Sequence, residues 1–385
     1  MQQSSIARST LRGGAGALGL GIALALAAAT SAEAESDYEI WAIDQGTNQV
    51  HIYSPALEEV ARIDLAAEGV RTAHMVDFTA DHAFAFIAST GSGDVTVIRS
   101  ADRAVVTRLA TGPRTHMATV SPDDSRAIAA VIGAPDTPGD GKLVEVLIDA
   151  ANGSFTIGRT LVVAEDPLVQ EKGERFSETQ PICQEFTADG RHAYVTLGPG
   201  LGEGGVVVLD LESFQLVAAY PVDEIQASCG TVRTADGRYM FVNGGSADVG
   251  VFYVIDTSTH EVVHQADTRG KDAHGVWPTQ DGSEVWMVNR VTSNAVIIDA
   301  ETFEITAEMN FVGKTPDIIA MSPDGRAYIS LRGPEPVTMP HVAVGETPGF
   351  AVVDIARREL IEVIQPAEAD PKSDFHGIGV RVIHD

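Results

Sequence analysis

Short apolar runs, separated by polar turns, fill almost the whole chain after residue 35. The turns share a pattern in which Ser or Thr is followed two residues later by Asp, as in Thr79-Ala80-Asp81. Each turn precedes a β-rich run such as residues 192–198, and a second apolar run then ends near an Asp, as in residues 251–256. No segment keeps the 3.6-residue period of a long helix. The pattern therefore predicts an all-β fold.

These runs recur as a unit of four short strands. Six full units cover residues 72 to about 365, and a repeat of about 40–45 residues with four strands is typical of a β-propeller blade. The remaining runs supply a seventh blade, with residues 375–383 as its innermost strand and residues 39–44, 49–53 and 60–65 as its outer three. Joining both chain ends in one blade closes the ring and leaves no long exposed edge. The alternative, two stacked β domains, lacks a linker anywhere in the chain.

The first 34 residues have the three parts of a secretory signal peptide. Arg8 and Arg12 form the charged start, residues 16–29 are small and apolar, and Ala32-Glu33-Ala34 supplies the cleavage pattern. A buried N-terminal helix is the alternative. We therefore expect a signal peptide over residues 1–34 and a single propeller domain over residues 35–385. The leader predicts that the mature protein functions in a bacterial periplasm.

The charge of the chain narrows the choice of partners. Its 54 acidic and 26 basic residues give a formal net charge of −28. Such a field repels nucleic acid and anionic lipid, so neither is expected as a partner. No later segment is apolar enough to span a membrane, and we expect a monomer without membrane insertion. An acidic surface also suits growth in salt, so charge alone indicates no function.

Histidines occupy one repeated position in the propeller. The innermost strand of each blade starts at one face of the channel, and the position seven residues before the turn Asp is equivalent in every blade. The copy of Asp272-Ala273-His274-Gly275 at Asp374-Phe375-His376-Gly377 gives the position in the last blade. In blade order from the fifth, the ring is predicted to read His274, Asp317, His376, His74, His116, Ile182 or Cys183, and Cys229.

Imidazoles and a carboxylate around one axis are ligands that suit a transition metal, most simply zinc or copper, with iron and manganese as alternatives. We expect His74, His116, His274 and His376 as the principal ligands and Asp317 as a fifth. Asp272 and Asp374, each two residues before a ring His, could accept from the second ring nitrogen. The alternative is a metal-free plug of hydrogen-bonded histidines and water.

The two cysteines after the leader, Cys183 and Cys229, are expected on adjacent inner strands. In an oxidising compartment they could form a disulfide if their Cα atoms lie within about 7 Å. Alternatively, Cys229 could be a thiolate ligand of the ring metal, which would favour copper or zinc.

The Ser-Pro-Asp-Gly turns and the strands that follow them, Tyr194-Val195-Thr196-Leu197 and Tyr328-Ile329-Ser330-Leu331, resemble those of the YVTN-repeat family of secreted propellers. That family is related to the cytochrome d1-like and lactonase-type propellers. The resemblance spans nearly all of residues 35–385 and implies a seven-bladed propeller. It implies no single function, because relatives of this type include binding proteins, enzymes and cofactor carriers.

Four insertions are expected on the face where the ring residues lie: residues 134–142, 165–181, 333–347 and 366–374. Long loops on one face often carry function, although insertions also collect where they do no harm. His341 lies in one of them and could be a movable extra ligand. Arg290 and Arg332 could orient an anion there, or could form solvated ion pairs.

Three functions remain open. The first is a metal-binding propeller that sequesters zinc or copper or hands it over, in the manner of a metallochaperone, with a periplasmic metal-transport or redox protein as partner. The second is an enzyme whose ring metal acts as a Lewis acid or redox centre on a small substrate under the loops. The third is a metal-free scaffold for protein interactions. We favour metal handling, and the sequence does not decide whether the protein is an enzyme.

Overall fold

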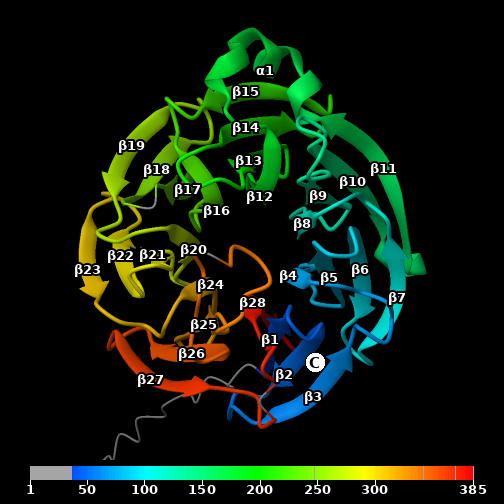
Figure 1. Ribbon diagram of the computed structural model, residues 1–385, viewed down its shortest axis with the longest axis vertical. Coiled ribbons are helices and arrows are strands. Elements are labelled where there is room, and N and C mark those ends of the chain that lie inside the picture. Colours follow the sequence, from blue (N-terminus) through cyan, green and yellow to red (C-terminus); the bar gives the residue numbers. More distant parts are fainter. Residues whose placement is uncertain (1–36, 247, 341, 369, 385) are drawn as a thin grey trace, which may run out of the picture. The chain divides into compact units, whose positions relative to one another are not determined.

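The computed structural model describes residues 37–385 apart from residues 247, 341, 369 and 385, and also leaves the side chain of Cys229 undescribed. The signal-peptide prediction lies outside the described residues. The described chain forms seven four-stranded antiparallel sheets around a central channel, as predicted (Figure 1). Neighbouring innermost strands contact one another in cyclic order, which closes the ring.

Every blade has the same strand order from the channel outward. The innermost strands are β4 (Ala73–Phe78), β8 (Thr115–Val120), β12 (Gln180–Phe186), β16 (Ala227–Arg233), β20 (Ala273–Pro278), β24 (Pro316–Met321) and β28 (Phe375–Val382). The second strands are β5 (Phe84–Ser89), β9 (Arg126–Val131), β13 (His192–Gly198), β17 (Tyr239–Gly245), β21 (Glu284–Asn289), β25 (Arg326–Leu331) and β1 (Tyr38–Asp44).

The outer half of each blade completes the sheet. The third strands are β6 (Asp94–Arg99), β10 (Lys142–Asp149), β14 (Gly205–Asp210), β18 (Gly250–Asp256), β22 (Asn294–Asp299), β26 (Gly349–Asp354) and β2 (Gln49–Tyr53). The outermost strands are β7 (Ala104–Leu109), β11 (Ser154–Val162), β15 (Gln215–Pro221), β19 (Val262–Asp267), β23 (Ile305–Met309), β27 (Glu359–Ile364) and β3 (Glu59–Asp64). One short helix, α1 (Pro167–Lys172), lies in the segment that enters the third blade.

The seventh sheet has the order β28-β1-β2-β3, so the C-terminal strand pairs with the three N-terminal strands as the sequence predicts. The core lies between blades. Strands β5 and β14 are buried at every position because a neighbouring blade covers each face, whereas the outermost strand β3 alternates between exposed and covered positions. This explains why the middle strands read as continuous apolar runs and the outer ones as alternating runs.

The repeated turn motif has a simple hydrogen-bonding role. In Thr279-Gln280-Asp281, the Thr279 hydroxyl donates to the Asp281 carboxylate at 2.7 Å, and the same carboxylate accepts the backbone N–H of Ser283 at 3.0 Å. These bonds hold the chain reversal between the first and second strands.

Candidate functional site

The predicted ring position coincides with an irregularity in the strand pairing of every blade. His74 lies at a register shift between Ala73 and Met75, and His116 lies at the equivalent shift between Thr115 and Met117. In each of the other five blades the register shift also includes the ring position, and three of these positions are occupied by His274, Asp317 and His376. A bulge bends a strand and redirects a side chain. Here it turns the ring residues towards the channel.

The backbone that enters the bulge is unusual. Two residues before the ring position, Thr72, Arg114, Asp272 and Thr315 have φ values of 50°, 55°, 62° and 51°. Non-glycine residues seldom adopt this left-handed conformation, and it tends to persist where surrounding structure holds a functional side chain in place.

A glycine follows the ring histidine at two places where neighbouring blades are in close backbone contact. A Cβ added at Gly377 would lie 2.5 Å from the carbonyl oxygen of His74, and one added at Gly275 would lie 2.3 Å from that of Asp317. In both cases the contact is to the ring residue of the next blade. The His-Gly dipeptides of the sequence therefore set the spacing between neighbouring ring residues.

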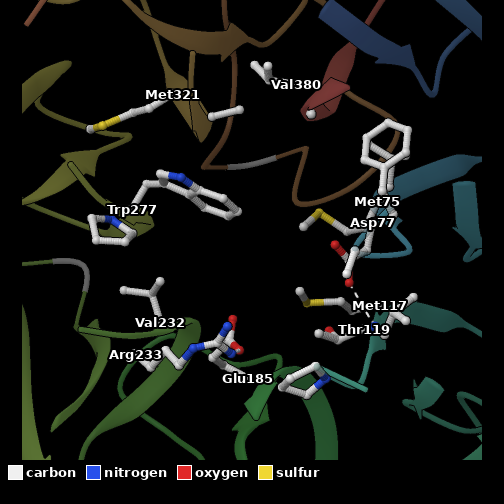
Figure 2. A pocket seen from close by; sticks show the side chains of 18 of the residues that line it. Met75, Asp77, Met117, Thr119, Glu185, Val232, Arg233, Trp277, Met321 and Val380 are labelled. Carbon is white, nitrogen blue, oxygen red and sulfur yellow. Dashed lines mark hydrogen bonds and ion pairs between the residues drawn. The ribbon is translucent and has the colours of Figure 1, made fainter. Parts of the chain in front are cut away.

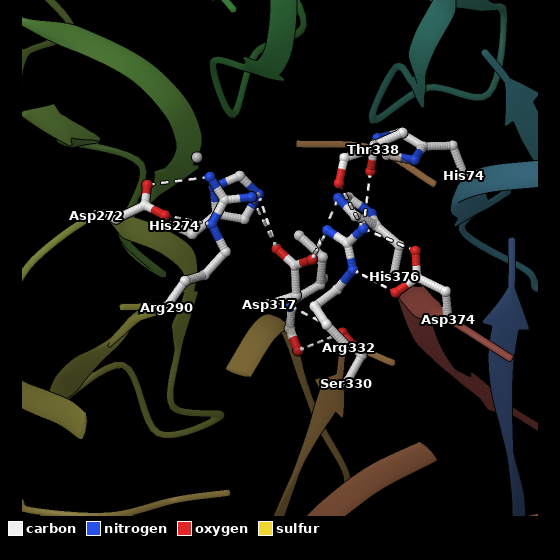
Figure 3. Close-up of polar contacts among 12 residues, drawn as sticks. His74, Asp272, His274, Arg290, Asp317, Ser330, Arg332, Thr338, Asp374 and His376 are labelled. Carbon is white, nitrogen blue, oxygen red and sulfur yellow. Dashed lines mark hydrogen bonds and ion pairs between the residues drawn. The ribbon is translucent and has the colours of Figure 1, made fainter. Parts of the chain in front are cut away.

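The structure brings His274, Asp317 and His376 together at the centre of the ring (Figure 3). All three are buried, and each offers a ligand atom within 4.8 Å of the other two. Nε2 of His274 lies 3.0 Å from Oδ1 of Asp317, and Nε2 of His376 lies 3.6 Å from Oδ2 of the same residue. Two imidazole nitrogens around one carboxylate form a donor set that suits a divalent transition metal.

The other two predicted histidines adjoin this group. The rings of His74 and His376 stack with centroids 3.6 Å apart, and Nε2 of His74 lies 3.0 Å from Nε2 of His116. The ring centroids of His116 and His376 are 6.2 Å apart. All four predicted histidines and Asp317 therefore meet at one place in the channel.

Gln45, just after β1, orients His74, and the sequence did not predict this role. Its amide nitrogen donates to Oδ2 of Asp374 at 2.8 Å, and its amide oxygen lies 2.8 Å from Nδ1 of His74. Because the oxygen can only accept, Nδ1 of His74 must carry the proton. The lone pair of the neutral imidazole is then on Nε2, which faces the cluster.

Arg332 is buried and joins two acidic residues. Its Nη1 lies 2.8 Å from Oδ2 of Asp317, and its Nε lies 2.7 Å from Oδ1 of Asp374. Asp374 also accepts from the backbone N–H groups of Gly333 and Val337, so it anchors the start of the loop after β25. The prediction that Asp374 holds the second nitrogen of His376 is wrong: Nδ1 of His376 is buried with no hydrogen-bond partner among the described residues.

Arg290 is the counterpart of Arg332 one blade earlier. Its Nε donates to Oδ2 of Asp272 at 2.7 Å, and its Nη1 lies 3.5 Å from Oδ1 of Asp317. Asp272 is thus an arginine partner, contrary to the role expected for it. The alternative of solvated ion pairs is also wrong for both arginines, because their side chains are 3% and 0% exposed. The sequence does contain a signal for these pairs. Both arginines stand just after the second strand of their blade, and each partner Asp stands two residues before a ring His.

Burial keeps His74, His116 and His376 neutral, whereas Asp317 is ionised. Burial lowers the pKa of His74 and His376 well below the usual value, and that of His116 to about 3. Burial alone would raise the pKa of Asp317, but the neighbouring His376, His274, Arg332 and Arg290 lower it well below its ordinary range. Neutral imidazole and ionised carboxylate are the forms that bind metal.

A cavity of about 310 Å³ adjoins the four histidines. Val337, Thr338 and Met339 cover part of it, and they belong to the predicted insertion of residues 333–347, which reaches towards the channel in Figure 1. Thr338 is held there because Nη2 of Arg332 donates to its carbonyl oxygen at 2.9 Å. Arg114 and Arg290 also line the cavity, and Ile132 and Ile182 give it an apolar wall.

Two predicted residues lie partly or wholly outside the described part of the chain. Cys229 is on β16, but its side chain is not described, and His341 is not described at all. Cys183 is buried on β12 and packs with Ile132, Ile182 and Met117. The disulfide and the thiolate ligand therefore both stay predictions.

Solved structures share the propeller fold. Dihydro-heme d1 dehydrogenase NirN, in complex with DHE, is 18% identical with a TM-score of 0.56, and the match covers 88% of this chain and 74% of that one. Kuenenia stuttgartiensis hydrazine synthase is 15% identical with a TM-score of 0.59, covering 88% and 99%. The propeller domain of Cps50 (Swd1) from Myceliophteria thermophila is 11% identical with a TM-score of 0.52, covering 77% and 93%.

No protein-family model matches the chain, and no curated protein matches it in sequence. The YVTN-repeat resemblance therefore stays a prediction, whereas the seven-bladed propeller is confirmed. None of the described helices is long and apolar enough to cross a membrane.

Proposed function

We propose that this protein binds a transition metal ion, zinc or copper, at the channel ring and hands it over in the periplasm, as a metallochaperone-like propeller. One observation carries the proposal: His274, Asp317 and His376, from three consecutive blades, bring two imidazoles and a carboxylate within 4.8 Å of one another in a buried site. The adjacent His74 and His116 could complete the coordination. The periplasm follows from the predicted leader.

The surrounding charges favour a cation at this place. Arg290 and Arg332 are each matched by their own acidic partner, Asp272 and Asp374, while Asp317 is shared between them. Three carboxylates thus face two guanidinium groups, which leaves one negative charge unmatched by an arginine. A buried group of this kind gains by binding a cation, because an unmatched buried charge is costly.

Metal content of the purified protein tests the proposal. We expect near-stoichiometric zinc or copper by mass spectrometry in untagged protein from the periplasm, and its loss from a His274→Ala/His376→Ala variant. His51→Ala is the matched control, because His51 is an equally buried histidine on β2, outside the ring. Circular dichroism establishes that each variant is folded. Absence of metal from the wild type, after growth with added zinc and copper, would leave the ring as a polar plug.

The adjoining cavity favours a metal-dependent enzyme as a second candidate. About 310 Å³ beside the ring is room for a small substrate, and in an enzyme the metal would polarise it as a Lewis acid or exchange electrons with it. Cobalt substitution separates the two roles. If the bound cobalt keeps an open position, azide changes its visible spectrum; a closed four-ligand site, suited to storage and transfer, leaves the spectrum unchanged.

A further inference from the structure

A second cavity, of about 430 Å³, lies at the other end of the channel, beside the Thr-x-Asp turns (Figure 2). We call it the lower cavity. Its wall includes the residue three positions after the ring position in all seven inner strands. These residues are Asp77, Thr119, Glu185, Val232, Trp277, Ala320 and Gly379.

Two carboxylates that line the lower cavity, those of Asp77 and Asp124, take part in no ion pair among the described residues. Glu185 is paired with Arg233, whose Nη1 donates to it at 2.5 Å. Asp77 accepts the backbone N–H of Val120 at 2.8 Å, and within the described part of the chain it takes part in no ion pair. Arg233 is thus already matched, and Asp77 leaves the cavity negative.

An indole faces this carboxylate. Trp277 is 40% exposed, whereas the other two tryptophans, Trp41 and Trp286, are fully buried. Figure 2 shows the ring of Trp277 reaching into the cavity from one side, and Asp77 and Met75 reaching into it from the other. Trp277 therefore gives the cavity an accessible aromatic face.

We propose that the lower cavity binds a small organic cation, an ammonium compound with an apolar body. A cation between the face of Trp277 and the carboxylate of Asp77 would gain a cation–π contact and an ion pair. The thioethers of Met75 and Met117 line the cavity and would pack against the apolar body. This site is separate from the channel ring and does not depend on a metal there.

Choline and its neutral isostere 3,3-dimethylbutan-1-ol test the proposal, because they share a shape and differ in charge. With metal-stripped full-length protein at pH 8, we expect calorimetry to show choline binding at least tenfold tighter than the alcohol. We also expect choline to protect the protein from acrylamide quenching of tryptophan fluorescence, since Trp277 is the exposed indole among the three.

Two variants locate the effect. Asp77→Asn should weaken choline binding at least tenfold and leave the alcohol unaffected, while Trp277→Leu should weaken both ligands. Asp354→Asn, on β26 in the outer half of a blade, is the control and should bind choline like the wild type. No choline binding by the wild type, equal affinity for both ligands, or full binding by folded Asp77→Asn would overturn the proposal. None of these outcomes bears on metal binding at the ring.

Discussion

Nε2 of His74 and Nε2 of His116 face each other at 3.0 Å across two neighbouring blades. Because Nδ1–H of His74 donates to the amide oxygen of Gln45, Nε2 of neutral His74 can only accept, and the metal-free pair requires Nε2–H of His116 to donate to it. A metal ion placed between them would instead be met by a lone pair from each ring. The two histidines can therefore either share a hydrogen bond or both coordinate a metal ion.

Gln45 distinguishes these roles. If His74 is a ligand, Gln45→Leu removes the group that orients its ring, and zinc affinity should fall about 10–100-fold, the usual cost of losing such a support. Competition with a chromogenic chelator measures this. An unchanged affinity would place His74 outside the coordination shell. Gln49→Leu, on β2, is a control at a glutamine without this role.

Gly377 controls the spacing between two ring histidines. A Cβ there would approach the carbonyl oxygen of His74 to 2.5 Å, so Gly377→Ala must push β28 and β4 apart. We expect a loss of about 1–3 kcal/mol in unfolding free energy, typical of overpacking, together with weaker zinc binding. Gly153→Ala is the control for zinc binding: its φ of 60° makes alanine strained there, but no atom lies within 4 Å of the added Cβ, so stability should fall while zinc affinity stays unchanged. Unchanged zinc affinity in a folded Gly377→Ala protein would contradict this role.

The fold and the ring could be predicted because both depend on repetition. Counting back from the turn Asp identified His74, His116, His274 and Asp317, and the copied Asp-x-His-Gly segment identified His376, without any distance information, because the blades repeat with the same spacing. The structure adds that a bulge redirects each side chain at this position, which a strict alternation of strand faces does not predict.

The supporting residues could not be predicted in the same way. Arg332 and Asp374 are 42 residues apart and belong to different blades, so their pairing depends on how the blades approach each other. Gln45 lies just after β1 and reaches His74 only because the N-terminal strands close the last blade. The lower cavity could not be predicted from the sequence, because the space there is left by small residues such as Ala320 and Gly379, which carry no functional group that would mark a binding site.

Arg332 should be essential for stability. Its removal in Arg332→Met leaves Asp374 without its buried counter-charge and leaves Asp317 with only the longer contact to Arg290, at 3.5 Å; breaking a buried pair in this way costs about 3–5 kcal/mol. Urea denaturation in the presence of EDTA measures the loss without a contribution from metal. The control is Arg357→Met, since Arg357 is 76% exposed and its ion pair with Asp354 should contribute less than about 1 kcal/mol. Equal stability of the two variants would show that the buried network is not needed for folding.

Asp77 should make the protein less stable as pH rises. Burial raises the pKa of its carboxyl from 3.8 to about 6, with partial relief from the N–H groups of Val120 and Phe78 and from Arg233. The folded state therefore holds this proton more tightly than the unfolded chain does. Below about pH 4 the group is protonated in both states and has no effect, and between about pH 4 and pH 6 its ionisation progressively favours unfolding.

Asp77→Asn removes this titration. Relative to the variant, the wild type should lose about 1 kcal/mol of unfolding free energy between pH 5 and pH 8, with most of the change below pH 7. Urea denaturation of both proteins at several pH values measures the difference, and comparison with the variant cancels the general repulsion in a chain of net charge −28. Glu185 is coupled to this titration: burial, above all, raises its pKa to about 7, and the charge of Asp77 contributes to that shift, so the difference between the two proteins includes a change in the titration of Glu185. A difference that stays constant over this range would mean that Asp77 is ionised in the folded protein as readily as in water.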